Sequence, residues 1–208
     1  MTQIIDISPK VNTTMAVWPG DTVFSVSWPA RINEGASCNV AAITSTPHLG
    51  AHADGPLHFQ EDAPGIGEVE LAPYLGRCRV VDVTGARVVN EESLFGSELG
   101  GAERILFRTG TFPDFERWNE DFAYLDPVLV RRLGKMGVKL VGIDTPSVDP
   151  FDSKDLPAHH AVLESGMRNL EGLDLSAAEP GDYELIALPL RLTEVDSSPV
   201  RAVLRTLD

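Results

Sequence analysis

The sequence contains little cysteine, and this shortage limits its redox chemistry. Its only cysteines, Cys38 and Cys78, do not have the C-x-x-C spacing of a thiolate metal site. We interpret them as reduced, buried small hydrophobic residues, with a disulfide or a thiolate metal site as the alternative. Residues 1–6 also do not resemble the basic and apolar regions of a signal peptide. Together these features predict a cytoplasmic protein.

Positive charge is also scarce. The 17 lysine and arginine residues are outnumbered by 31 aspartate and glutamate residues, which gives a formal net charge of −14. An acidic chain repels nucleic-acid phosphates and anionic membrane surfaces, so we expect no nucleic acid and no membrane as a partner. No apolar run approaches the length that spans a membrane. The partners that we expect are a small-molecule substrate and other protein subunits.

Histidine is rare but clustered. Three of the five histidines lie within residues 46–59, with the spacing H-x-G-x-H-x-D-x-P-x-H. The motif residues occupy even positions, whereas the odd positions hold Leu49, Ala51, Ala53, Leu57 and Phe59. In an extended chain these two sets face opposite sides, one polar and one apolar. The pattern indicates that the polar side chains converge on a site.

A straight strand would not bring these histidines to one ion. At roughly 3.3 Å per residue, the Cα atoms of His48 and His58 would lie about 33 Å apart. Gly50 and the Gly55-Pro56 pair allow the chain to bend, which predicts a hairpin of loop and strand. Neutral imidazoles and a carboxylate suit zinc or a similar ion, so the predicted ligands of a first site are His48, His52 and Asp54. The alternative is a polar surface loop.

The other two histidines, His159 and His160, are adjacent. They fall in the first turn of a short helix predicted over residues 155–166, with Asp155 as its N-cap. Glu171 follows on a predicted strand, flanked by leucines, where a carboxylate would be costly to bury without a partner. A metal ion would remove that cost.

The remaining pattern predicts a mixed α/β fold in a single domain over residues 1–208. A helix is expected from Asp126 to Gly134 or Gly137. Strands are expected at 3–8, 23–28, 39–45, 78–83, 105–110, 139–144, 169–173, 183–190 and 202–207. Asp144, at the end of a strand, is interpreted as the cap of the turn that follows it, with a functional role at the strand end as the alternative. Trp18 is either core packing or a wall for a flat ligand. We assign no chemistry to the loop at 193–199.

Four segments, in this order and at these separations, resemble the cyclase-like metal-dependent hydrolases and, within them, the bacterial kynurenine formamidases (arylformamidases). These segments are Trp18-Pro19-Gly20-Asp21, the stretch from His48 to His58, Asp144-Thr145-Pro146-Ser147, and His159-His160 with Leu170-Glu171-Gly172-Leu173. The resemblance implies a single mixed-sheet α/β domain of the cyclase-like (swivelling β/β/α) type.

The resemblance also implies roles for particular residues. One zinc ion would be held by His48, His52 and Asp54, and a second by Asp54, His159 and Glu171. His58 would donate and accept protons, and Trp18 would contact the substrate. We choose His159 over His160 because its interval to Glu171 matches that of the family. Ala51 and Gly55 stand where the wider family has threonine and alanine, and neither change removes a ligand.

The implied activity is metal-dependent hydrolysis of N-formyl-L-kynurenine to L-kynurenine and formate in tryptophan degradation. The same nitrogen and oxygen ligands would also accept manganese or cobalt. Alternatives are hydrolysis of another aryl amide or a lactam such as isatin, or a non-catalytic metal-stabilised binding protein. No Gly-x-Ser-x-Gly element supports a serine nucleophile. We further expect a homodimer, with the aromatic-rich segment from Phe112 to Tyr124 as its interface.

Overall fold

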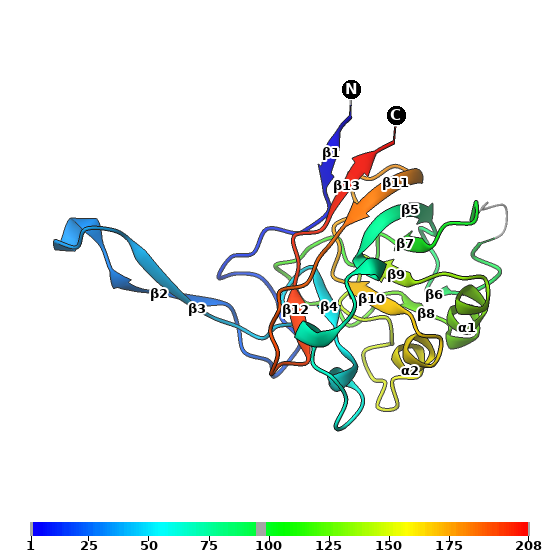
Figure 1. Cartoon of the computed structure of the whole chain (residues 1–208), viewed down its shortest axis with the longest axis horizontal. Coiled ribbons are helices and arrows are strands. Elements are labelled where there is room, and N and C mark those ends of the chain that lie inside the picture. The colour runs from blue at the N-terminus through cyan, green and yellow to red at the C-terminus, as the bar shows by residue number, and fades with distance from the viewer. Residues whose placement is uncertain (1, 95–98, 208) are drawn as a thin grey trace.

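The computed structural model describes residues 2–94 and 99–207. Within these residues nine strands form one large sheet (Figure 1). In spatial order they are β1 (Ile4–Asp6), β13 (Val203–Thr206), β11 (Gly181–Ile186), β5 (Leu75–Asp82), β7 (Arg104–Arg108), β9 (Leu140–Ile143), β10 (Arg168–Glu171), β4 (His52–Asp54) and β12 (Ser197–Pro199). The four central strands, β5, β7, β9 and β10, are parallel, and the strands at both sides are antiparallel. The predicted mixed α/β fold is confirmed.

The central strands are buried on both faces of the sheet. On one face α1 (Pro127–Lys135) and α2 (Pro157–Glu164) pack side by side and enclose a core that includes Ile105, Phe107, Val141 and Ile143. The opposite face has its own core, which includes Val80, Leu106, Leu140 and Leu170. Because successive strand residues point to opposite faces, the continuous apolar runs at 105–107 and 140–143 supply both cores.

Helix α1 forms where the sequence predicts it. The Asp126 carboxylate accepts a hydrogen bond from the Val128 N–H at 2.8 Å, and Pro127 occupies the first helical position. The predicted cap of α2 is wrong, because Leu156 precedes this helix in a left-handed conformation with φ of 42°. The carboxylate of Asp149 instead accepts from the N–H groups of Ala158 and His159, at 2.9 and 3.0 Å.

A hairpin of β2 (Ser25–Ala30) and β3 (Val40–Thr44) extends away from the large sheet (Figure 1). We call residues 23–44 the arm. A second small sheet pairs β6 (Val88–Val89) with β8 (Tyr124–Leu125). Short 3-10 helices occupy Ile32–Glu34, Pro56–His58, Ile66–Glu68 and Ala72–Tyr74. Among the described residues, no helix has the length and apolar character needed to cross a membrane.

Candidate metal centre

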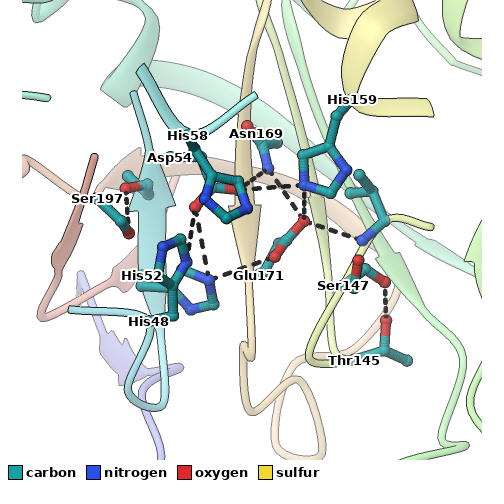
Figure 2. Close-up of polar contacts among 12 residues, drawn as sticks. His48, His52, Asp54, His58, Thr145, Ser147, His159, Asn169, Glu171 and Ser197 are labelled. Carbon is teal, nitrogen blue, oxygen red and sulfur yellow. Dashed lines mark hydrogen bonds and ion pairs between the residues drawn. The ribbon is translucent and has the colours of Figure 1, made fainter. Parts of the chain in front are cut away.

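The predicted ligand stretch becomes strand β4, which pairs antiparallel with β10 so that His52 lies opposite Glu171. Because side chains alternate along a strand, His52 and Asp54 of β4 share a face with Asn169 and Glu171 of β10. Figure 2 shows these four side chains close to one another. As whole residues, His52, Asp54 and Glu171 are 2 to 3% exposed. Strand register therefore concentrates imidazole and carboxylate groups in a buried place.

Two of these imidazoles present a lone pair to the cluster. His52 Nδ1 lies 2.8 Å from the Gly50 carbonyl oxygen, and His159 Nδ1 lies 2.7 Å from an Asp149 carboxylate oxygen. Each Nδ1 therefore donates a proton, so that Nε2 carries a lone pair whenever the ring is neutral. Both Nε2 atoms and Asp54 Oδ1 are buried without a hydrogen-bond partner among the described residues. Unsatisfied nitrogen and oxygen lone pairs at one place fit a divalent cation.

The distances between these atoms support the same reading. His52 Nε2 lies 3.3 Å from Glu171 Oε2, and His159 Nε2 lies 3.1 Å from Glu171 Oε1 and 3.4 Å from Asp54 Oδ2. His48 Nδ1 lies 3.1 Å from Asp54 Oδ1. The structure thus brings all five predicted ligands together. Within the described residues, two groups could each surround one ion, namely His52 with Asp54 and Glu171, and His48 with Asp54 and His58. Asp54 belongs to both groups, but their members differ from the predicted ligand sets, because His58 is in one group and His159 is in neither.

The two histidines of α2 have different surroundings. His159 is 2% exposed and enters the cluster from the first turn of the helix (Figure 2). His160 is exposed, and its ring lies 6.0 Å from that of Phe59. The geometry therefore favours His159 as the ligand, in agreement with the choice made from its interval to Glu171.

The cluster is strongly negative when its histidines are neutral. Burial alone would raise the pKa of Asp54, but the imidazoles of His159 and His48 beside it, when protonated, hold that pKa well below its usual value. Burial lowers the pKa of His48, yet the carboxylates of Asp196 and Asp54 raise it to about 10. Burial likewise opposes the charged form of His159, and Glu171 and Asp149 raise its pKa well above its usual value. This field attracts positive charge, whether a proton or a metal ion.

Three polar residues around the cluster were not found from the sequence. Asn169 donates from Nδ2 to Asp54 at 2.6 Å and to Glu171 at 3.1 Å. Its position two residues before Glu171, on the same face of a strand, is a signal that could have found it. Asp149 orients His159 from ten residues away, and no local pattern announces it.

The third is Asp196, in the loop to which we assigned no chemistry. Its Oδ2 atom lies 2.8 Å from His48 Nε2 and 3.1 Å from His58 Nδ1. Part of the same loop forms β12, in which Ser197 pairs with Asp54 of β4. The interpretation of 193–199 as a loop is therefore wrong at Ser197–Pro199, which form β12, and Asp196 just before this strand borders the cluster. Asp144 has a structural role, but it accepts hydrogen bonds from the Thr109 and Gly110 N–H groups rather than capping its own turn.

A cavity of about 450 Å³ opens onto the cluster. His48, His52, His58, His159 and Glu171 line one part of it, and the aromatic rings of Trp18, Phe112, Phe115 and Trp118 line another. The centroid of the Trp18 ring lies 5.2 Å from that of Trp118 and 5.1 Å from that of Phe151. Trp18 thus belongs to the wall of a cavity whose size suits a small aromatic molecule.

The aromatic segment from Phe112 to Tyr124 turns inward. Phe112 and Phe122 are 5% and 1% exposed, and both rings pack against Trp118. The segment covers its own chain, so its expected use as a subunit interface has no support here.

Comparison with known proteins identifies the family of this chain and finds solved structures with the same fold. The family described as "Putative cyclase" matches residues 5–150. The kynurenine formamidase of Bordetella pertussis is 45% identical over 208 residues, which is all of both chains. The structure of a "predicted metal-dependent hydrolase" from Bacillus stearothermophilus superposes on all of both chains with a TM-score of 0.84 at 21% identity. Isatin hydrolase A from Labrenzia aggregata, also 21% identical, has a TM-score of 0.83 and covers 100% of this chain and 94% of its own. Those two structures show the fold alone.

Proposed function

This chain belongs to the cyclase family, and from that premise we propose that it hydrolyses N-formyl-L-kynurenine to L-kynurenine and formate, a step of tryptophan degradation. The observation that carries the proposal is one cavity that combines a buried imidazole and carboxylate cluster with an aromatic wall. Full-length identity of 45% to a kynurenine formamidase supports this substrate over others. In the reaction water adds to the formyl carbon, the amide C–N bond breaks, and the aryl nitrogen gains a proton.

We propose zinc as the cofactor, with two ions per chain. His48, His52 and Asp54 would hold one ion, and Asp54, His159 and Glu171 would hold the other. Three protein ligands leave coordination positions open for water and substrate. Bound there, the ions would supply a Lewis acid for the formyl carbonyl and acidify a water molecule. The same donors would accept manganese or cobalt.

The remaining steps belong to protein side chains. Trp18 would stack on the aryl ring and orient the formyl group toward the cluster. His58 would protonate the departing aryl nitrogen, because it borders the cavity and has the residue type that exchanges protons near neutral pH. A non-catalytic binding protein would have no need of this imidazole beside the metal ligands.

We further propose a cytoplasmic homodimer in which residues 1–208 act as one domain. Strands from both ends of the chain pair in the large sheet, β1 with β13, which supports one domain. The free thiols of Cys38 and Cys78 suit a reducing compartment. The arm carries exposed apolar side chains that a second copy would cover, and these side chains are Val23, Val26, Trp28, Ile32, Val40 and Ile43.

The first experiment measures metal content and N-formyl-L-kynurenine hydrolysis on one metal-replete sample, before and after chelation. We expect about two metal ions per chain and turnover that disappears with the metal. His58→Ala should keep the metal and lose most turnover, whereas Asp54→Ala should lose both. His160→Ala is the matched control, because this exposed imidazole lies next to a proposed ligand, and it should change neither quantity.

Other results would redirect the proposal. Full turnover in His58→Ala would remove its role in proton transfer. Bound metal without turnover would leave a metal centre with another substrate, and isatin would be assayed next because an isatin hydrolase shares the fold. No metal and no turnover would reject the proposed function.

A further inference from the structure

One carboxylate oxygen contacts two histidines that have different proposed tasks. Asp196 Oδ2 lies 2.8 Å from Nε2 of His48, a proposed metal ligand, and 3.1 Å from Nδ1 of His58, the proposed proton donor. The two rings lie together, with centroids 4.2 Å apart. Asp196 also lines the cavity. It is therefore placed to act on both residues at once.

The backbone, rather than the carboxylate, anchors Asp196. Its carbonyl oxygen accepts a hydrogen bond from the Gly55 N–H at 2.7 Å. The next residue, Ser197, is fully buried, pairs with Asp54 in the sheet and donates from Oγ to the Ala53 carbonyl at 2.9 Å. These contacts attach it to β4, which carries His52 and Asp54, and to Gly55, which directly follows that strand. These backbone contacts hold the loop, and the side-chain carboxylate contacts the two imidazoles.

The contact selects one form of His58. A carboxylate accepts hydrogen bonds, so the nitrogen that faces it, Nδ1, carries a proton. Nε2 is then the nitrogen available to exchange a proton with the substrate. A histidine without this partner would distribute its proton between both nitrogens and rotate more freely. Orientation of a catalytic imidazole by a carboxylate is a recurring arrangement in proton-transfer sites.

We propose that Asp196 is a positioning residue that holds His58 in the Nδ1-protonated form and orients His48 through the same oxygen. This inference rests on the proposed function, because it assigns Asp196 a role in that reaction. Asp196 itself touches neither the reacting atoms nor a metal ion in this assignment. Its effect on turnover passes through His58.

The test uses Asp196→Asn in the full-length, zinc-loaded protein. Asparagine has the same shape, and its amide can donate to His58 Nδ1, so that the ring changes tautomer while the backbone anchors remain. We expect kcat to fall by about 10² or more with KM changed by less than about threefold, because only the transition state uses the oriented imidazole. Zinc content should stay at the wild-type value. Asp196→Glu, which keeps the carboxylate, should recover part of the lost kcat.

A second readout does not depend on catalysis. Long-range ¹H–¹⁵N correlation spectra of the zinc-loaded protein report which nitrogen of each histidine is protonated. We expect a proton on Nδ1 of His58 in the wild type and a different tautomer or a mixture in Asp196→Asn. Glu194→Gln is the control, since this exposed carboxylate lies on the same loop two residues away, and it should change neither kcat nor the spectrum.

Three outcomes would overturn the proposal. They are a kcat for Asp196→Asn within about threefold of the wild type, a lower kcat with the His58 tautomer unchanged, and loss of zinc together with turnover at an unchanged tautomer. The last would make Asp196 a structural support of the metal site alone. If the wild type does not hydrolyse N-formyl-L-kynurenine, the proposed function fails, but the spectra still decide whether Asp196 sets the form of His58.

Discussion

Asp54 is the residue on which the centre depends. Its side chain is buried, contacts His48 and His159, and accepts a hydrogen bond from Asn169. A buried carboxylate must be compensated by cations or donors, and here three imidazoles and an amide surround it. Glu171 is equally buried nearby, so two negative charges share a small volume. A divalent ion between the two carboxylates would compensate both negative charges.

This charge arrangement makes metal binding depend on pH. Because its carboxylate neighbours raise the pKa of His48 to about 10 in the metal-free protein, this imidazole is protonated at neutral pH. The pKa of Asp54 is lowered, so Asp54 is already ionised. Zinc must therefore displace protons from histidine, and its affinity should rise with pH, by up to about tenfold per pH unit for each proton released.

Competition titrations with a colorimetric chelator between pH 6 and 8 measure this slope. His160→Ala, which removes an exposed imidazole outside the cluster, should show the wild-type slope. An affinity that does not change with pH would show that the ligands are already deprotonated before metal binds.

At the scale of elements, the turn before β4 is held against the end of β10. Gly172, with φ of 61°, directly follows Glu171, and a Cβ atom placed on it would lie 2.2 Å from the Gly50 carbonyl oxygen. The same Gly50 oxygen accepts the hydrogen bond from His52 Nδ1. The close approach of Gly172 to Gly50 thus places the acceptor that orients a proposed ligand.

Gly172→Ala should disturb this contact. Gly166→Ala is its matched control, because Gly166 has a φ of 66° and an added Cβ there meets no described atom within 4 Å. Both variants carry the cost of an alanine in the left-handed region, about 1–2 kcal/mol. Gly172→Ala should lose about 1–3 kcal/mol more from the free energy of unfolding, because its Cβ also collides with backbone.

Urea unfolding of the metal-free variants gives these free energies, and chelator competition gives their zinc affinities. We expect zinc affinity to fall about tenfold or more in Gly172→Ala and to stay unchanged in Gly166→Ala. Equal losses of stability in the two variants would show that the Gly50 turn shifts to accommodate the added Cβ at no cost in free energy. Gly172 would then not position His52.

At the scale of the whole molecule, the arm exposes apolar side chains that no other described part of a single copy of the chain covers. Every residue of β3 and most of β2 are exposed, and Ile43 is 69% exposed. Figure 1 shows the arm extending from the body, where no other part of the drawn chain covers it. Apolar side chains gathered on a projecting hairpin are typical of an interface with another chain.

Ile43→Asp should weaken the proposed homodimer, because it places a charge within the buried contact. Ile4→Asp is the control, since Ile4 is 66% exposed on β1 at another part of the molecule. Sedimentation velocity at micromolar concentration should show a dimer for the wild type and Ile4→Asp, and a shift toward monomer for Ile43→Asp. A monomeric wild type would reject the homodimer, and equal behaviour of the two variants would exclude the arm as its interface.

What the sequence by itself determined was local. Alternation along 48–58 predicted that His52 and Asp54 share a face, Asp126 and Pro127 marked the start of α1, and apolar runs marked the central strands. These signals work because their causes, the period of a strand and the unpaired N–H groups of a helix end, lie within a few residues. The resemblance to a known family added the prediction that His159 and Glu171 join Asp54, although they are distant from it in the sequence.

Tertiary structure alone decided which distant groups support that centre. Asn169 reaches Asp54 across 115 residues, and Asp196 reaches His58 across 138. Both contacts exist because β10 and β12 pair with β4 on opposite sides. No local pattern encodes which strands become neighbours, because that choice is made by burial of the whole sheet.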